Sequence, residues 1–260
     1  MTYDKFEGRT PYYVLLLHGH GLNRTYFRPL AKKLANEGIS HLALDLPGYG
    51  FARDIDCKTY DEIVDYILGI LDAEKIGDVV SAGYSYGGFI SLALHARLKD
   101  RIKGLVLMAS SYEISVRTLN LNFVWRYYPI YTVINEACWL KYKEGKMDYD
   151  FSEVAMKDSD LQMVRHSSIA TTRKNMIKNQ AVMTQRSLRP QVEAVTAPTL
   201  IVQPTRCQFF SKRSYDFLHK TIPNAQRVRI DMLHNIAPAW DAIFPAMRDF
   251  LASAASVGCP

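Results

Sequence analysis

The 260-residue sequence predicts an α/β protein with a mostly parallel sheet, helices on both faces and an inserted helical cap. Three observations support this fold class. Strand-like and helix-like segments alternate along most of the chain, the strand-like segments are short apolar runs, and the alternation is interrupted once before it resumes. Strands that alternate with helices build parallel sheets whose faces are covered by those helices.

The alternation begins close to the N-terminus and defines most of the expected elements. Strands are expected at Tyr12–Leu17, Ile39–Leu44, Asp78–Gly83 and Gly104–Ala109, and helices at Tyr26–Glu37, Tyr60–Leu71 and Gly87–Arg97. After the interruption, strands are expected at Thr199–Gln203 and Arg227–Ile230, and helices at Ser211–Lys220 and within Pro238–Ala252. Right-handed crossovers place the C-terminal ends of parallel strands along one sheet edge, where ligands bind in open α/β sheets.

The interruption covers residues 113–190 and has a different composition. It contains helix-like stretches such as Asp160–Gln180 but no strand of the earlier kind. Its aromatic residues are Phe123, Trp125, Tyr127, Tyr128, Tyr131, Trp139 and Tyr142. We therefore predict a core formed by residues 1–112 and 191–260, with a helical cap at 113–190.

Composition excludes several classes of protein. Apolar residues make up 48% of the chain and charged residues 22%, which is ordinary for a globular domain and unlike a disordered chain or a disulfide scaffold. The net charge of +6 is spread among acidic residues, so no nucleic-acid partner is expected. No apolar run approaches the ~20 residues of a membrane span, and Met1–Thr10 lacks the apolar core of a signal peptide. We therefore expect a cytoplasmic protein. The four cysteines show no CxxC spacing, so neither a zinc site nor a redox pair is expected.

The first chemical motif is Gly83-Tyr84-Ser85-Tyr86-Gly87-Gly88, with the form G-x-S-x-G. It directly follows an expected strand and directly precedes an expected helix. In that context the serine stands on a sharp, strained turn that exposes its hydroxyl at a helix N-terminus. Ser85 is therefore the candidate nucleophile.

Two loops after strands complete the early part of the site. His18-Gly19-His20-Gly21 follows the first expected strand, and acyl transfer needs backbone N–H donors for the oxyanion. We expect those donors from Tyr86 and His20, with His18 structural. Asp45, in Asp45-Leu46-Pro47-Gly48, is interpreted as a residue that orders a turn rather than as a catalytic acid.

The candidate general base is His234, which follows the last expected strand and precedes the last helix. A histidine in that loop can reach the serine from neighbouring strand ends, and the chain order of serine before histidine fits this assignment. Together the four segments resemble the α/β-hydrolase superfamily, in its cap-bearing esterase, thioesterase and C–C hydrolase branch. The resemblance covers residues 11–112 and 197–252. Only about ten residues precede the first parallel strand, so we expect the sheet to be short by one or two strands.

The resemblance also exposes a departure at the third catalytic position. Relatives place an Asp or Glu after the penultimate strand, in a G-x-x-D-x-F pattern, and here that position holds Cys207. No Asp or Glu occurs between Glu193 and Asp216. A thiol is a weak acceptor and does not replace a carboxylate well.

Three explanations stay open for this departure. Glu113, just past the Gly104–Ala109 strand, can supply the carboxylate from a neighbouring strand end. Alternatively the site is weakened, by natural divergence or by a deliberate substitution. Finally, Cys207 itself can act as the partner of His234 or as a reactive thiol.

The resemblance implies a cofactor-free serine hydrolase that cleaves an ester, thioester or related carbonyl compound of a small molecule. The alternatives are a weakened or non-hydrolytic binding protein, and a C–C hydrolase or lyase that uses the same serine and histidine. In relatives the cap covers the serine, and the aromatic residues of 113–190 indicate an apolar cavity. This segment contributes +4 of the net charge of +6, which weakly favours a carboxylate-bearing or acyl-thioester substrate.

Overall fold

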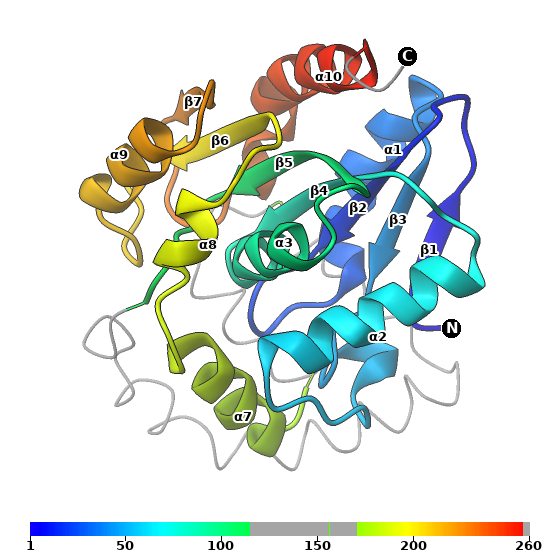
Figure 1. Cartoon of the computed structure of the whole chain (residues 1–260), viewed down its shortest axis with the longest axis vertical. Coiled ribbons are helices and arrows are strands. Elements are labelled where there is room, and N and C mark those ends of the chain that lie inside the picture. Colours follow the sequence, from blue (N-terminus) through cyan, green and yellow to red (C-terminus); the bar gives the residue numbers. More distant parts are fainter. Residues whose placement is uncertain (115–155, 157–170, 257–260) are drawn as a thin grey trace.

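The computed structural model of the chain describes residues 1–114, 156 and 171–256. Its centre is a seven-stranded sheet in the order β1-β3-β2-β4-β5-β6-β7 (Figure 1). The strands are β1 (Tyr3–Phe6), β2 (Tyr13–Leu17), β3 (His41–Leu44), β4 (Val79–Tyr84), β5 (Ile102–Met108), β6 (Thr199–Pro204) and β7 (Gln226–Ile230). All neighbouring strands are parallel except β1, which pairs antiparallel with β3.

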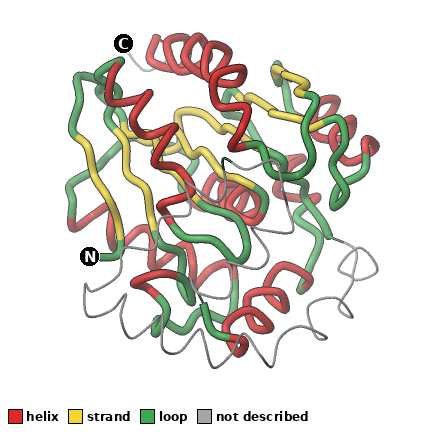
Figure 2. Tube along the Cα trace, turned by 180° about the vertical axis from the view of Figure 1, so that it is seen from behind, coloured by secondary structure: helices red, strands yellow, loops and turns green. Residues whose placement is uncertain are grey.

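Helices cover both faces of this sheet (Figures 1 and 2). The α-helices of the described residues are α1 (Arg28–Asn36), α2 (Tyr60–Ala73), α3 (Tyr86–Arg97), α7 (Arg173–Thr184), α8 (Arg189–Glu193), α9 (Lys212–Thr221) and α10 (Trp240–Ser256). Short 3₁₀ helices occur at Arg24–Phe27, Gly50–Ala52 and Ala237–Ala239. Helices α1 and α10 pack on one face, and α2, α3, α8 and α9 pack on the other.

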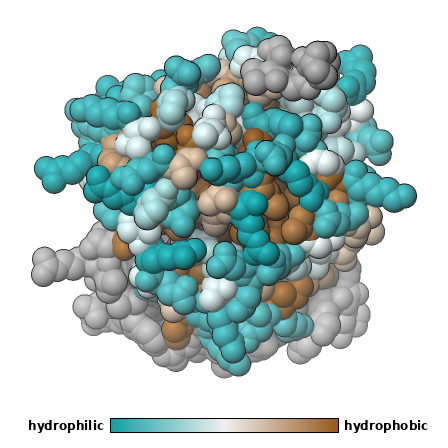
Figure 3. Space-filling model, in the orientation of Figure 1, coloured by the Kyte–Doolittle hydropathy of each residue, from teal (hydrophilic) through white to brown (hydrophobic). Residues whose placement is uncertain are grey.

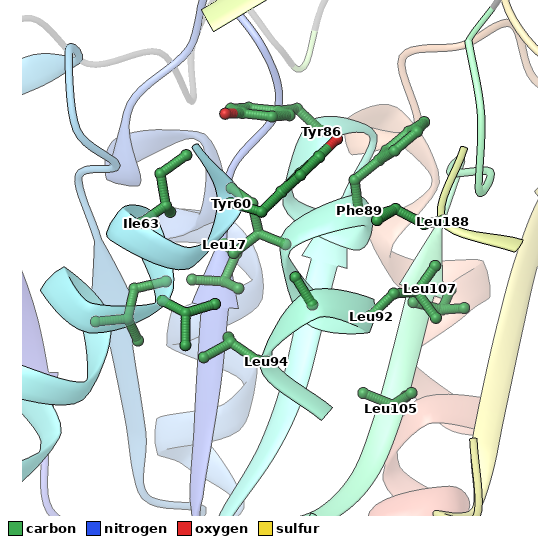
Figure 4. Close-up of a cluster of buried hydrophobic side chains, with 14 of the residues drawn as sticks. Leu17, Tyr60, Ile63, Tyr86, Phe89, Leu92, Leu94, Leu105, Leu107 and Leu188 are labelled. Atoms are coloured by element: carbon green, nitrogen blue, oxygen red, sulfur yellow. The ribbon is translucent and has the colours of Figure 1, made fainter. Parts of the chain in front are cut away.

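The strand β2 shows why its sequence is continuously apolar. Val14 and Leu16 belong to the hydrophobic cluster under α1 and α10, whereas Leu15 and Leu17 belong to the cluster under α2 and α3. Successive side chains of a strand point to opposite faces, so a strand buried on both faces must be apolar at every position. Figure 4 shows the second cluster, in which Leu17 lies among side chains of α2 and α3.

The predicted elements match the structure with small shifts at their ends. Each expected strand and each core helix is present, and the fold class is confirmed. The sequence analysis missed β1, a four-residue strand with half-exposed ends that carries little periodic signal. This strand lies within the ten residues that precede β2, so the N-terminal segment does contribute an antiparallel strand to the sheet.

The predicted cap lies mostly outside the described residues. This applies to its seven named aromatic residues, to His166 and to residues 160–170 of the expected helix; α7 begins at Arg173. Polar side chains of the described part fasten α7 to the core: Asn175 Nδ2 donates to the carbonyl oxygens of Gly48 and Arg53, at 3.2 and 2.7 Å. The boundaries 113–190 and the covering of the site by a cap remain predictions.

The surface seen in Figure 3 is mostly hydrophilic where it is described, with hydrophobic residues showing mainly near its middle. The large hydrophobic residues that are strongly exposed in the described ranges are Met1, Met156 and Ile177. No helix in those ranges is long and apolar enough to cross a membrane.

Candidate active site

The candidate nucleophile Ser85 stands between β4 and α3 in a strained conformation. Its φ is 50° and its ψ is −112°, a backbone conformation that non-glycine residues rarely adopt and that costs about 1–3 kcal/mol. Two hydrogen bonds hold the turn: Ser85 N donates to Met108 O at 2.9 Å, and Ser110 Oγ donates to Ser85 O at 2.8 Å. The strain keeps the side chain at the C-terminal edge of the sheet.

The glycines around Ser85 are required by close backbone contacts. A Cβ atom at Gly83 would lie 2.2 Å from Gly87 O, and one at Gly87 would lie 2.0 Å from Leu17 O. Atoms cannot approach that closely, so any larger residue would separate strand from helix. The spacing of the G-x-S-x-G motif thus follows from sterics at this turn.

His234 lies against Ser85, with 2.9 Å between its Nε2 and Ser85 Oγ. The histidine is buried in the loop after β7, and its backbone is held on both sides: Tyr84 OH donates to His234 O, and His234 N donates to Gln208 Oε1. The ring of Phe209 packs 4.6 Å from the imidazole ring, centroid to centroid. Burial lowers the pKa of His234 to about 3, so the imidazole is neutral and can accept a proton at physiological pH.

The other imidazole nitrogen faces Cys207 rather than a carboxylate. Cys207 Sγ lies 3.4 Å from His234 Nδ1, and the N–H of Phe210 donates to the same sulfur at 3.4 Å. In the described part of the chain, no Asp or Glu side chain forms a hydrogen bond or ion pair with His234. Ser85, His234 and Cys207 therefore form one continuous row of contacts.

The two carboxylates considered from sequence lie elsewhere. Glu113 is exposed and interacts with Tyr112, and no hydrogen bond or ion pair joins it to His234 among the described residues. Asp45 is fully buried and accepts hydrogen bonds from the backbone N–H groups of Arg24 and Phe51, at 2.9 and 2.8 Å. It also pairs with the Arg24 guanidinium, as expected for a residue that orders a turn.

The loop His18–Gly21 packs directly against the turn Gly83–Gly87 that carries Ser85, which we call the elbow. A Cβ atom at Gly19 would lie 2.8 Å from the Tyr84 ring and 3.3 Å from Ser85 Cβ, so only glycine allows this approach. Tyr86 is the first residue of α3, where backbone N–H groups have no acceptor within the helix. The loop that carries His20 thus lies against Ser85, next to the N–H of Tyr86, and the oxyanion role of these two groups stays a prediction.

His18 and His20 have different surroundings. His18 is fully buried, with Nδ1 donating to Gly19 O at 2.8 Å and Nε2 accepting from Leu46 N at 3.0 Å. Both of its nitrogens are thus used by the backbone, which fits a structural role. His20 is half-buried, and its Nδ1 lies 2.7 Å from Tyr49 OH.

Sequence reasoning missed the contact between Tyr49 and His20. Tyr49 lies in the segment Asp45–Gly50, which was interpreted only as a turn, and no spacing rule relates it to the loop after β2. In the structure, two residues of α7 bind the backbone around Tyr49: Asn175 Nδ2 donates to Arg53 O, and Asn179 Nδ2 donates to Pro47 O at 3.3 Å. The segment that carries Tyr49 is therefore bound to α7 through its backbone and to the candidate oxyanion loop through the Tyr49 hydroxyl.

The described residues contain no cluster of three or more His, Cys, Asp or Glu side chains that could hold a metal ion. Within these ranges, the side chains gathered at the elbow are a hydroxyl, an imidazole and a thiol. Such a set can carry out nucleophilic chemistry with proton transfer on its own.

Comparison with known proteins finds similarity over part of the chain. A family model described as the alpha/beta hydrolase fold matches residues 12–133, which include the His18–Gly21 loop and the elbow. A pimeloyl-[acyl-carrier protein] methyl ester esterase of Aliivibrio salmonicida is 31% identical over 98 residues, 38% of this chain and 36% of that protein. A 2-hydroxymuconate semialdehyde hydrolase of Pseudomonas sp. (strain CF600) is 34% identical over 121 residues, 45% of this chain and 42% of that protein.

A solved structure extends the similarity over nearly the whole chain. The enol-lactonase from Burkholderia xenovorans LB400 has a TM-score of 0.78 and 22% identity, covering 96% of this chain and 95% of its own. At that identity the likeness shows the fold, while the sequence matches span about two fifths of the curated relatives. The chain has the alpha/beta hydrolase fold, and the family model of that name matches its residues 12–133.

Proposed function

We propose that the chain is a serine hydrolase that cleaves an ester, thioester or related carbonyl compound through an acyl-enzyme on Ser85. The observation that carries this proposal is the 2.9 Å contact between Ser85 Oγ and His234 Nε2 at a strained strand-to-helix turn. A serine is a weak nucleophile until an adjacent base takes its proton. The neutral, buried His234 is such a base.

The reaction proceeds in two balanced steps. Ser85 Oγ bonds to the substrate carbonyl carbon while its proton moves to His234 Nε2, and the carbonyl electron pair becomes an oxyanion held by the N–H groups of Tyr86 and His20. Collapse of this intermediate breaks the bond to the alcohol or thiol, which takes the proton from Nε2. Water then attacks the acyl-enzyme in the same way and releases the acid.

Cys207 is the third member of this site in the proposal. Its contact with Nδ1 orients the imidazole, but a neutral thiol stabilises the transient imidazolium less than a carboxylate does. We therefore expect a slow hydrolase. If the thiol gives no useful stabilisation, the same site would bind a small molecule without hydrolysing it.

A second candidate reaction is hydrolysis of a carbon–carbon bond. The supporting observation is the similarity to a 2-hydroxymuconate semialdehyde hydrolase, which matches 45% of the chain. Product analysis on candidate vinylogous ketones separates this reaction from ester hydrolysis. Such hydrolysis releases a carboxylic acid from the carbonyl side of the broken bond and a shortened fragment that gains a proton at the other carbon. Detection of both products would favour this reaction.

A fluorophosphonate probe tests the proposal directly. It should label Ser85, identified by peptide mass mapping, and short-chain nitrophenyl esters should be hydrolysed at a rate that the probe abolishes. Heat-unfolded protein is the control for non-specific labelling. Folded protein that is neither labelled nor active on these esters would refute a hydrolytic role.

The pH profile follows from the environment of His234. The base must be neutral, and burial holds its pKa at about 3 instead of the ordinary 6.5. As pH falls, kcat/KM should stay nearly constant down to about pH 5, because the imidazole gains a proton only near its lowered pKa. Initial rates on a nitrophenyl ester, taken where circular dichroism is unchanged, provide the measurement. A midpoint near 6.5 would contradict the lowered pKa.

Tyr49 provides a test of how the oxyanion loop is positioned. Tyr49→Phe removes the hydroxyl that lies 2.7 Å from His20 Nδ1, at a cost of about 1 kcal/mol of hydrogen bonding. We expect kcat to fall about fivefold with KM little changed, since the oxyanion exists only in the transition state. Tyr12→Phe is the matched control, because Tyr12 OH donates to Leu251 O at 2.9 Å in another part of the core. Equal kinetic effects of both variants would rule out a positioning role.

A further inference from the structure

The sulfur of Cys207 is surrounded by three hydrogen-bond donors. The N–H of Phe210 donates to it at 3.4 Å. His234 Nδ1 lies at 3.4 Å and carries the ring proton whenever Nε2 accepts from Ser85. The third group is the hydroxyl of Tyr215, a residue that is 1% exposed and that interacts with Cys207.

Tyr215 independently indicates that the surroundings of the Cys207 sulfur favour an anion. Its buried hydroxyl has no oxygen or nitrogen acceptor among the described residues, and the sulfur of Cys207 is its neighbour; burial first, and then Cys207, raises the pKa of the phenol. A buried hydroxyl that meets only a weak sulfur acceptor loses free energy that a stronger acceptor would recover. A neutral thiol is a weak acceptor, whereas an anion with oxygen atoms would satisfy this donor and the two others.

We infer that Cys207 is a site of oxidation by hydrogen peroxide, and that its sulfinate acts as the anionic third member of the site and activates hydrolysis. This inference rests on the proposed serine hydrolase. Hydrogen-bond donors around a sulfur stabilise the thiolate once the proton leaves, and the thiolate is the form that peroxide oxidises. Cys207 is also only half-buried, so a small oxidant has access.

The oxidation balances with two equivalents of peroxide. The thiolate sulfur attacks one peroxide oxygen, the O–O bond breaks, and the products are a sulfenic acid and hydroxide. The sulfenic sulfur attacks a second peroxide, which leaves as water and yields the sulfinic acid. Loss of one proton gives the sulfinate, so sulfur loses four electrons and each peroxide gains two.

The sulfinate reproduces what a carboxylate does at this position. It carries a negative charge on two oxygen atoms, and this charge beside Nδ1 favours the imidazolium that forms when Ser85 loses its proton. Sulfinates are not reduced by ordinary thiols. Activation should therefore persist after peroxide and thiol reductants have been removed.

Cys57 is the matched control within the same chain. It is buried, and desolvation together with Glu62 and Asp65 raises the pKa of its thiol to about 11. It therefore stays a thiol at neutral pH and resists oxidation. Cys57→Ser should respond to peroxide as the unchanged protein does.

The experiment treats the full chain with graded hydrogen peroxide, removes it with catalase, adds dithiothreitol, and measures nitrophenyl ester hydrolysis alongside peptide mass mapping. We expect kcat/KM to rise by about tenfold or more, part of the ~10⁴-fold that a triad acid supplies, in step with two added oxygen atoms on Cys207. The acid limb of the pH profile should move to higher pH, since an anion raises the pKa of His234. Cys207→Ser and Cys207→Asp should show no gain.

Several results would overturn the inference. These are oxidation of Cys207 without a gain in rate, a gain that dithiothreitol reverses, a gain that survives in Cys207→Ser, or no oxidation of Cys207 at all. Fluorophosphonate labelling of the untreated protein reports separately on the proposed function. Labelled Ser85 without activation by peroxide refutes the inference alone, whereas an unlabelled, inactive protein refutes the proposed function.

Discussion

Replacing Cys207 with aspartate should raise kcat/KM for an activated ester by about 10⁴-fold, the loss that follows removal of the acid from a Ser-His-Asp site. The substitution places a carboxylate against His234 Nδ1, where Cys207 Sγ now lies at 3.4 Å. The charge stabilises the imidazolium in the transition state, and the Phe210 N–H is already in place to hold the new carboxylate. Steady-state kinetics on nitrophenyl esters measure the gain.

The matched control for this change is Cys207→Asn, which has the same shape as aspartate without its charge. It should give no comparable gain, because an amide orients the ring without stabilising its positive form. The acid limb of the aspartate variant should also move to higher pH, as the carboxylate raises the pKa of His234. A folded aspartate variant that is no faster would show that another acid serves His234, and Glu113→Gln would then test the sequence-derived alternative.

Replacing Ser85 with alanine should remove the covalent step, with a loss that depends on the residue at position 207. In a protease with an intact triad, loss of the serine costs about 2 × 10⁶ in kcat and loss of the acid alone about 3 × 10⁴, and the effects do not add. If Cys207 contributes little as an acid, Ser85→Ala should therefore cost only about 10²-fold in the unchanged protein. In the Cys207→Asp background the same change should cost about 10⁶-fold.

Both serine variants should reach a common residual rate, which comes from binding and the oxyanion donors alone. Alanine keeps a Cβ atom at the strained turn, so the fold should be retained, and thermal unfolding checks this. The unchanged protein, the two single variants Ser85→Ala and Cys207→Asp, and the double variant form a double-mutant cycle. This cycle measures the coupling free energy between positions 85 and 207. A Ser85→Ala variant as active as its parent would contradict the nucleophile assignment.

The elements of the fold were predictable because their signals are local. The apolar run Tyr13–Leu17 and the helical spacing of α2 each depend on residues a few positions apart. The elbow at Ser85 is equally local, since glycines within four residues create the steric conditions for it. The strand β1 was missed because its four residues, two exposed and two half-buried, carry almost no periodic signal.

The site beyond the elbow depends on pairings that no local rule specifies. Ser85 and His234 are 149 residues apart, Cys207 and His234 are 27 apart, and His20 and Tyr49 are 29 apart. The sequence motifs identified four of these residues as candidates. They left open whether Glu113 or Cys207 is the partner of His234. Tyr49 was not named at all.

By itself, the sequence determined the parallel α/β architecture, the strained serine and the lack of an acid after the penultimate strand, because periodicity, steric limits and residue identity are properties of short segments. Only the tertiary structure decided that Cys207 lies against His234 Nδ1, that Glu113 interacts with Tyr112 and that Tyr49 contacts His20. These contacts arise where the ends of parallel strands meet at one sheet edge, and the register and packing of the whole core determine which atoms face each other there.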